Sequence, residues 1–251
     1  MLLSHPVIFF LVSLLVLWLS AQLGTHLRRR RPLKDDERQD FDIVEAATLT
    51  LLGLIIGFTF SMATTRYDLR KNYEEAEANA IGTEFVRAGL LPAADAAAVR
   101  AQLKRYMELR LRFYETRDER VLQQIDADTA QIQTQMWSAV QAPALANPSP
   151  LIALAVAGMN DVLNSQGYTQ AAWWNRIPIS AWALMIAIAV CCNLLLGYGA
   201  RKAETKSGYL FVLPLVVSVA FLLISDIDSP RRGFIHVVPQ NLISLSQSLS
   251  R

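Results

Sequence analysis

Residues 42 to 91 constrain the fold more than any other stretch of this chain. The run Ile43–Ala63 is apolar and long enough to cross a bilayer. The residues that follow, from Arg66 to Leu91, are charged, yet neither Gly nor Pro interrupts them before Gly82. We therefore predict one long helix, half in lipid and half in water, which links a membrane part to a soluble part.

Three further apolar blocks predict three more membrane spans, four in all. They are Pro6–Gln22, about Ile179–Tyr198, and Tyr209–Ser225, in which Pro214 is tolerable as a kink. No positive charge precedes the first block, and Arg28–Arg31 follows it, which is the reverse of a signal peptide. The first span is therefore expected to stay as a membrane anchor.

These spans predict an all-α fold in which a helical bundle is inserted between the second and third spans. The expected divisions are 1–63 for the first transmembrane pair with a short basic loop, 64–177 for the extramembrane helical domain, 178–226 for the second transmembrane pair, and 227–251 for the C-terminal tail.

The inserted region contains no alternating runs typical of strands and is expected to be helical throughout. After a break at Gly89–Pro92, helices are predicted from about Ala93, from about Asp118 to Gln141, and over Leu151–Gln166, with Ala142–Pro143 ending the second of them. With the extension of the second span they make a four-helix domain of about a hundred residues. The apolar stripe on the helix from Ala93 is Val99, Leu103, Tyr106, Met107, Arg110 and Phe113.

Basic residues near the spans predict the orientation. Nine Lys or Arg lie on the side of the 23–42 and 199–208 loops, against six near the membrane on the other side. The 64–177 region is therefore expected outside the cytoplasm. Tyr168, Trp173, Trp174 and Arg176 are expected at headgroup level, where the chain returns to the membrane.

The second span has two distinct faces. Gly53, Gly57 and Ser61 recur every four residues and form a ridge of small residues at which another helix, or a copy of this one, can approach closely. A mixed stripe on another face could border a pore; it comprises Glu45, Thr48, Leu52, Ile55, Thr59, Met62 and Arg66. Alternatively, Thr48 and Thr59 bond to their own helix and the stripe is ordinary bundle interior.

Residue patterns typical of enzymes are missing from the sequence. His5, His26 and His236 lie in separate segments without metal-ligand spacing, and the adjacent Cys191 and Cys192 fall inside a predicted span. No nucleophile arrangement or phosphate-binding loop can be singled out. We therefore expect no enzyme activity, no cofactor or metal, and no nucleic-acid partner.

Charged residues gather where the second and fourth spans leave the same face of the membrane. They are Arg66, Arg70 and Glu77 on the second helix and Asp226, Asp228 and Arg231 after the fourth. We predict that Asp226 or Asp228 pairs with Arg66 or Arg70, because a partly dehydrated carboxylate gains from a guanidinium neighbour. The alternatives are snorkelling into headgroups and local pairing of Arg70 with Glu74 along the helix.

Several motifs resemble one known family. The run Gly57–Ala63, then Arg66-Tyr67-Asp68, Glu77–Thr83 and Asp228–Gly233, is similar to bacterial membrane proteins with a bestrophin-like domain, over nearly the whole chain. The resemblance implies kinship with bestrophins, which are anion channels built as pentamers around second-span helices with aromatic constrictions. Phe58 and Phe60 are the candidates for such a ring. The chain lacks the acidic calcium-clasp run of bestrophins, and its basic loops predict the opposite orientation.

The expected function is therefore an oligomeric ion channel of the bacterial inner (plasma) membrane, an anion channel if the resemblance extends that far. The second span would line the pore, with Glu45 at one mouth, Arg66 and Arg70 at the other, and a hydrophobic constriction between them that gates by dewetting. The constriction would come from Leu52, Ile55 and Phe58 or Phe60. The alternative is a membrane-tethered sensory or scaffold protein whose helical domain binds a ligand or partner. Membrane lipid, further copies of the chain and an inorganic ion are the expected partners.

Overall fold

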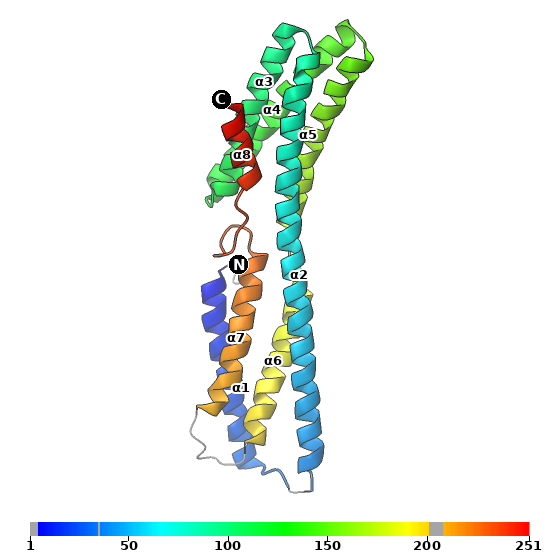
Figure 1. Ribbon diagram of the computed structural model, residues 1–251. Helices are drawn as coiled ribbons and strands as arrows, with labels where there is room; N and C mark the ends of the chain where they lie inside the picture. Colours follow the sequence, from blue (N-terminus) through cyan, green and yellow to red (C-terminus); the bar gives the residue numbers. More distant parts are fainter. Residues whose placement is uncertain (1–4, 35, 201–207, 251) are drawn as a thin grey trace. The chain divides into compact units, whose positions relative to one another are not determined.

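The computed structural model describes residues 5–34, 36–200 and 208–250, which form eight α-helices and one short 3-10 helix (Figure 1). The helices are α1 (Pro6–Arg30), α2 (Arg38–Arg87), η2 (Ala88–Leu90), α3 (Ala93–Glu115), α4 (Glu119–Ala146), α5 (Pro150–Trp174), α6 (Ile179–Gly199), α7 (Tyr209–Asp228) and α8 (Gln240–Leu249). No strand occurs in these three ranges, which confirms the all-helical class. Arg201, Lys202 and Lys206, which the orientation argument counted, lie outside the described residues.

The chain divides into two compact units, and α2 contributes to both. The membrane unit contains residues up to 66 and from 176 to 236, and the helical unit contains residues 67–175 and 237–251. In the part of the chain that the structure describes, four helical segments are long and apolar enough to cross a membrane, as the sequence predicted; they fall in α1, α2, the α5–α6 region and α7. The helix α2 is 50 residues long, which confirms the unbroken second helix.

In the membrane unit, α1 packs against both α6 and α7. Near the start of α1 the ring of Phe9 lies 5.1 Å from the Trp182 ring and 6.0 Å from the Phe221 ring, centroid to centroid. Towards the other end, Gly24 of α1 and Gly197 of α6 lie directly on the partner backbone. A β-carbon on Gly24 would collide with the Leu194 carbonyl, and one on Gly197 with the Ala21 carbonyl. The absence of these side chains is what lets α1 and α6 cross so closely.

The helical unit has an apolar core of its own. Most of the residues predicted as the α3 stripe are buried there, among them Val99, Leu103, Tyr106 and Phe113, together with residues of α4 and α5. Asp118 and Ser149 cap α4 and α5, because their side chains accept hydrogen bonds from the backbone N–H of Arg120 and Ile152 at 2.8 and 3.2 Å. This unit buries large side chains in the manner of a water-soluble bundle.

Two helix ends differ from the sequence predictions. The helix α4 continues through Pro143 to Ala146, because a proline removes one intrahelical donor but its carbonyl still accepts the Asn147 N–H at 2.9 Å. The helix α5 continues past Gln166 to Trp174, and Gly167 within it makes no turn. A single Pro or Gly therefore did not mark an end where the flanking residues pack well.

The C-terminal segment contains a helix that the sequence analysis missed, α8. Its Leu242 is buried in the core of the helical unit, and a β-carbon on Gly82 of α2 would touch the Leu245 side chain. The Glu74 carboxylate of α2 accepts hydrogen bonds from the Leu242 N–H at 2.9 Å and from the Asn241 amide at 2.6 Å. A buried carboxylate on another helix therefore satisfies donors at the start of α8.

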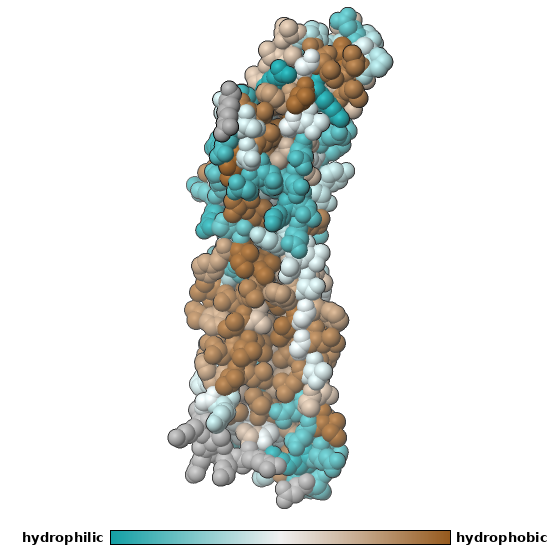
Figure 2. Space-filling model, viewed as in Figure 1, coloured by the Kyte–Doolittle hydropathy of each residue, from teal (hydrophilic) through white to brown (hydrophobic). Residues whose placement is uncertain are grey.

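The surfaces of the two units differ in polarity. In Figure 2 the surface over α1, α6, α7 and the membrane half of α2 is largely apolar, whereas the helical unit shows mixed polar and apolar residues. A pale band of intermediate hydropathy runs along the membrane half of α2. Exposed small or weakly polar residues on this half of α2 include Thr50, Gly53, Gly57, Ser61 and Thr65.

Candidate functional site

The mixed stripe of α2 is only partly available to a pore. Leu52 and Thr59 are buried within the single chain, at 2% and 5% exposure. The Thr59 hydroxyl donates to the Ile55 carbonyl at 2.7 Å, and the Thr48 hydroxyl donates to the Val44 carbonyl at 2.7 Å. Both threonines thus bond to their own helix, and the burial of Leu52 and Thr59 favours the bundle-interior alternative at these two positions.

The small-residue ridge has the opposite environment. Gly53, Gly57 and Ser61 are exposed in the single chain. A β-carbon placed on Gly53 or Gly57 would have no neighbouring atom within 4 Å. None of the residues that the structure describes therefore uses the close approach that this ridge permits.

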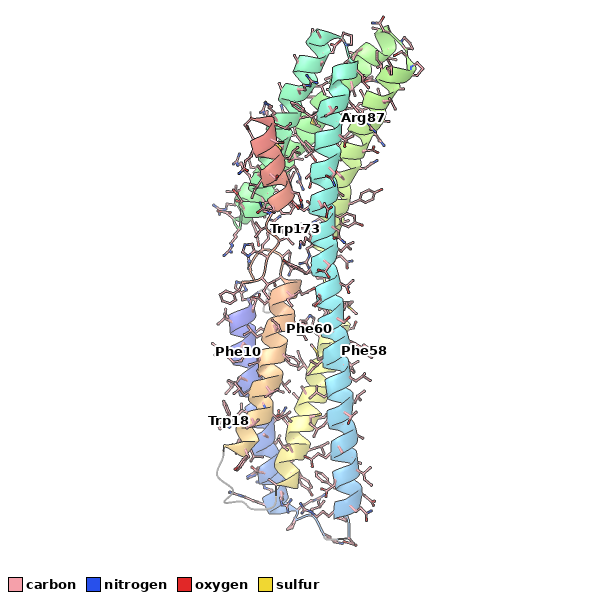
Figure 3. The ribbon with its side chains drawn as sticks, in the orientation of Figure 1. Phe10, Trp18, Phe58, Phe60, Arg87 and Trp173 are labelled. Atoms are coloured by element: carbon pink, nitrogen blue, oxygen red, sulfur yellow. The ribbon has the colours of Figure 1, made fainter. Side chains whose placement is uncertain are left out.

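Phe58 and Phe60 are both exposed, by 65% and 40% of their surfaces. Two residues apart on an α-helix are rotated by about 200°, so the two rings leave α2 on opposite sides, as Figure 3 shows. Only one of them can face a given pore axis. Phe58 shares its side of α2 with Met62 and Leu54, which are spaced by four and are also exposed.

At the start of α2, side chains contact the end of α6. The Phe41 ring lies 5.6 Å from the Tyr198 ring, and a β-carbon on Gly199 would lie 3.0 Å from the Glu45 carboxylate. The Arg28 guanidinium donates to the Tyr198 carbonyl at 2.8 Å, which satisfies one of the free carbonyls at the end of α6. Glu45 is half-buried in this contact region rather than fully open.

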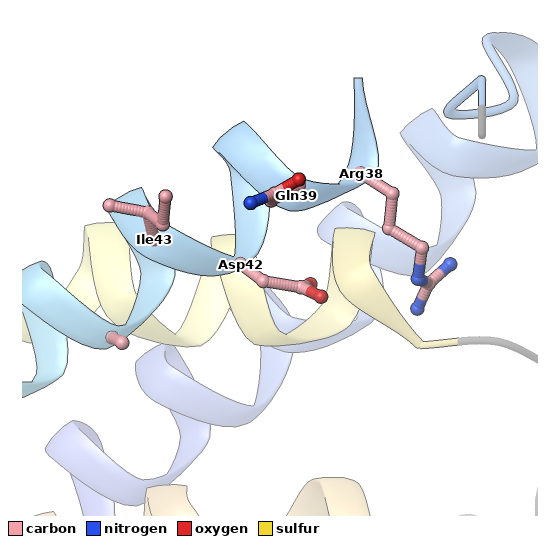
Figure 4. Close-up of a pocket in the computed structure, with 5 residues that line it drawn as sticks. Arg38, Gln39, Asp42 and Ile43 are labelled. Carbon is pink, nitrogen blue, oxygen red and sulfur yellow. The ribbon is translucent and has the colours of Figure 1, made fainter. Parts of the chain in front are cut away.

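The same end of α2 carries a shallow pocket of about 550 Å³ (Figure 4). Its walls are Arg38, Gln39, Asp42, Ile43 and Ala46. This combination of one cation, one anion, one amide and two apolar side chains fits the polar boundary of a membrane helix. It lies at the end of α2 where Glu45 was expected at a pore mouth.

The two carboxylates in the last turn of α7 accept hydrogen bonds from nearby backbone N–H groups. Asp226 accepts hydrogen bonds from the N–H groups of Phe234 and Ile235 at 2.7 and 2.8 Å. Asp228 accepts from the Ile177 N–H at 3.1 and 3.3 Å, just before α6 begins. These two aspartates therefore fix the turn after α7 and the entry to α6. The predicted pairing with Arg66 or Arg70 stays a prediction.

Glu77 lies in a cluster that the sequence analysis did not anticipate. It was grouped with the charges at the membrane exit, whereas its carboxylate is fully buried in the helical unit. It accepts from the Arg110 Nε at 2.5 Å, and from the Tyr106 and Thr169 hydroxyls at 3.2 Å each. The signal was present in the predicted apolar stripe of α3, where Arg110 stands among apolar residues and must find a counter-ion.

The cluster holds its charges in place electrostatically. Burial lowers the pKa of the Arg110 guanidinium, but the adjoining Glu77 carboxylate outweighs burial and raises that pKa above its ordinary value. Burial, together with the Glu77 charge, raises the pKa of Tyr106 well above its ordinary value. Arg110 and Glu77 therefore remain an ion pair, with Tyr106 as a neutral donor.

Trp173, which was expected at headgroup level, is part of the core of the helical unit. It is buried, and its ring lies 5.0 Å from Phe113 and 5.5 Å from Tyr114. The next residue, Trp174, is exposed. The expected position of Tyr168, Trp173, Trp174 and Arg176 at headgroup level stays a prediction.

Within the described ranges, no group of three or more His, Cys, Asp or Glu side chains is arranged to hold a metal ion. His5 contacts the Arg232 guanidinium at 3.1 Å, and Cys192 is buried beside the exposed Cys191.

The fold and these features define an all-helical, multi-span membrane protein with a second helical unit. The family model for the bestrophin-like domain matches residues 7–242, so the chain belongs to the bestrophin-like family. No match was found among curated proteins.

Solved structures share the fold. A crystal structure of a bacterial bestrophin homologue from Klebsiella pneumoniae, phased on zinc, is 13% identical with a TM-score of 0.65 and covers 96% of this chain and 98% of its own. A single-substitution variant of that homologue is 12% identical with a TM-score of 0.66, covering 96% and 97%. The chain therefore matches the bestrophin fold over nearly its whole length.

Proposed function

We propose that this chain forms a homo-oligomeric ion channel in the bacterial inner membrane, with the membrane half of α2 lining the pore. The observation that carries the proposal is the exposed face of that half, on which a row of small residues stands beside a row of apolar ones. Four spans alone seldom enclose a pore, so the pore requires several copies. A pentamer follows from the family resemblance.

The residues on this exposed face would have two roles in an oligomer. Gly53, Gly57 and Ser61 would contact the α2 helix of a neighbouring copy, because small residues permit close backbone approach. Leu54, Phe58 and Met62, displaced by one position along the sequence, would face the axis. Phe58 is the most exposed of the three and would form a hydrophobic constriction that gates by dewetting.

Kinship with bestrophins supports an anion as the conducted ion.

The membrane orientation follows from the distribution of basic residues. The four consecutive arginines at 28–31, at the end of α1, support a cytoplasmic position for that end of α1 and an extracytoplasmic position for residues 64–177. In intact cells, a Cys at exposed Gln131 should react with a membrane-impermeant thiol reagent, whereas one at exposed His26 should not. The reverse pattern would place the helical unit in the cytoplasm.

Channel function is tested by reconstitution in liposomes with flux recorded separately for chloride and sodium. In a variant with Cys191→Ser and Cys192→Ala, Phe58→Cys should make flux sensitive to a thiol reagent, because position 58 would face the pore. The matched control is Leu52→Cys, which is buried within the chain and should stay insensitive. Absence of flux from well-folded oligomers, or block at position 52 alone, would overturn the proposal.

A second candidate function is a membrane-tethered scaffold or sensor, and one observation favours it. A groove of about 490 Å³ between α4 and α5 in the helical unit is lined mainly by apolar side chains, among them Trp137, Ile152 and Val156. A partner or ligand bound there would explain its exposed apolar surface. The flux assay separates the two functions, since a scaffold gives no flux.

A further inference from the structure

Glu84 is a buried carboxyl group in the helical unit that has no hydrogen-bond donor. It lies on α2, its side chain is fully buried, and neither carboxyl oxygen has a hydrogen-bond partner among the described residues. The carboxyl lies against Gly158 of α5, where a β-carbon would collide with it. Glycine at position 158 thus makes room for this carboxyl between the two helices.

The surroundings of Glu84 do not neutralise its charge. Two charged groups face it, Arg87 from its own helix and Asp161 from α5, and these form a loose ion pair at 3.9 Å. Burial raises the pKa of Glu84 to about 8, and Asp161 adds to the shift while Arg87 opposes it. Glu84 therefore carries a proton over much of the physiological pH range.

Glu77, two helical turns earlier, shows what a structural carboxylate looks like in this unit. It is equally buried but accepts hydrogen bonds from Arg110, Tyr106 and Thr169. Glu84 has none of these donors, although both residues lie on the same side of α2. The fold supports an ionised group at position 77 and a neutral one at position 84.

We propose that Glu84 is a proton-binding site that makes the α2–α5 contact of the helical unit sensitive to pH. With the proton bound, the neutral carboxyl stays against Gly158 and the two helices are closed. When the proton leaves to water, the carboxylate needs donors that the closed contact lacks, so the contact opens until the group reaches solvent beside Arg87. Nothing but a proton is exchanged.

The sign of the effect follows from linkage. The carboxyl binds its proton more tightly in the closed contact than in an open one, where its ordinary pKa of 4.5 applies. The stabilisation is therefore complete below about pH 4.5 and is lost progressively up to about pH 8. Across that window the opening constant should rise by up to about tenfold per pH unit, and it should level off above it.

Hydrogen exchange of the full-length protein in detergent measures this opening. Amides around Glu84 and Gly158 should lose protection as the pH rises from 5 to 8, after correction for intrinsic exchange rates. Glu84→Gln, which mimics the protonated carboxyl, should abolish that pH dependence. The matched control is Glu75→Gln, an exposed glutamate on the same helix, and it should keep the parental profile.

A second variant leaves Glu84 in place and tests the site independently of any folding defect. Asp161→Asn removes the neighbouring negative charge, so the pH at which protection levels off should shift downward. Infrared difference spectra of the parent should show a protonated carboxyl at pH 6 that disappears above pH 8. Identical pH profiles for the parent and Glu84→Gln, or an ionised Glu84 at pH 6, would overturn the proposal.

Discussion

The membrane unit and the helical unit make their closest internal contacts in opposite ways. In the membrane unit the tightest contact is backbone against backbone, at Gly24 and Gly197, and the Ser13 and Ser20 hydroxyls bond to carbonyls of their own helix. In the helical unit, large side chains surround a buried ion pair, Glu77 with Arg110. Lipid offers no hydrophobic drive between helices, so close approach must hold them, whereas water drives a large apolar core together.

The comparison predicts that the helical unit is most sensitive to loss of charge pairing. Arg110→Met should lower the free energy of unfolding by about 3–5 kcal/mol, because it leaves the Glu77 carboxylate buried and unpaired. The double variant with Glu77→Gln should recover much of that loss. Arg112→Met, at an exposed position two residues on, is the control. Denaturant titration of the helical unit measures all three, and equal losses for Arg110→Met and Arg112→Met would contradict the role given to the pair.

The membrane unit should instead be sensitive to the smallest added side chain. Gly197→Ala introduces one methyl group against the Ala21 backbone, which cannot move aside as a flexible side chain can. We expect a loss of about 1–3 kcal/mol, the range for overpacking. Ala187→Leu adds more volume at an exposed position of α6 and should change little. Thermal unfolding in detergent distinguishes them; a larger effect at position 187 would mean that packing at Gly197 is loose.

Turns at the ends of the membrane helices should show an intermediate effect. Asp226→Asn replaces a carboxylate that accepts from the Phe234 and Ile235 N–H groups, so we expect a loss of about 1–2 kcal/mol. The double variant with Arg66→Gln tests the pairing that the sequence predicted. A loss smaller than the sum of the single losses would demonstrate coupling, whereas additive losses would restrict Asp226 to its backbone partners.

Patterns that extend over many residues predicted most of the helices correctly, whereas single residues were the poorest guides to where helices end. Apolar block length was enough to place the spans, because a bilayer imposes a length that sequence displays directly. Pro143 and Gly167 were poor guides to helix ends, since tertiary packing overrides a single weak position. The helix α8 was missed because it is only ten residues long. In addition, the acceptor for the N–H donor near its start is Glu74, which lies far away along the chain.

Candidate site residues were harder to predict than helices, because sequence shows which side of a helix a residue occupies but not what covers that side. Leu52 and Phe58 both suited a constriction, yet one is buried in the chain and the other is exposed. Glu77 and Glu84 look alike in sequence, and their difference depends on Arg110 and Gly158, which lie far away along the chain. Only the packed structure separates such pairs.

The smallest effect on the stability of the chain should come from a substitution in the small-residue ridge of α2. Unlike the glycines of α1 and α6, the glycines of this ridge make no close backbone contact with the described part of the membrane unit. Gly57 is a small residue on a membrane helix, as Gly197 is, but a β-carbon on Gly57 would meet no atom of residues 5–34, 36–200 or 208–250 within 4 Å. Gly57→Leu should therefore change the free energy of unfolding of the isolated chain by no more than about 0.5 kcal/mol, as at a surface site. The same change should markedly weaken assembly, because a bulky side chain would hold a neighbouring backbone away. Native mass measurement and crosslinking report assembly, and unfolding of the dissociated chain reports stability. Unchanged assembly would mean that the ridge faces lipid, and a loss of chain stability would mean that a segment of the same chain covers it.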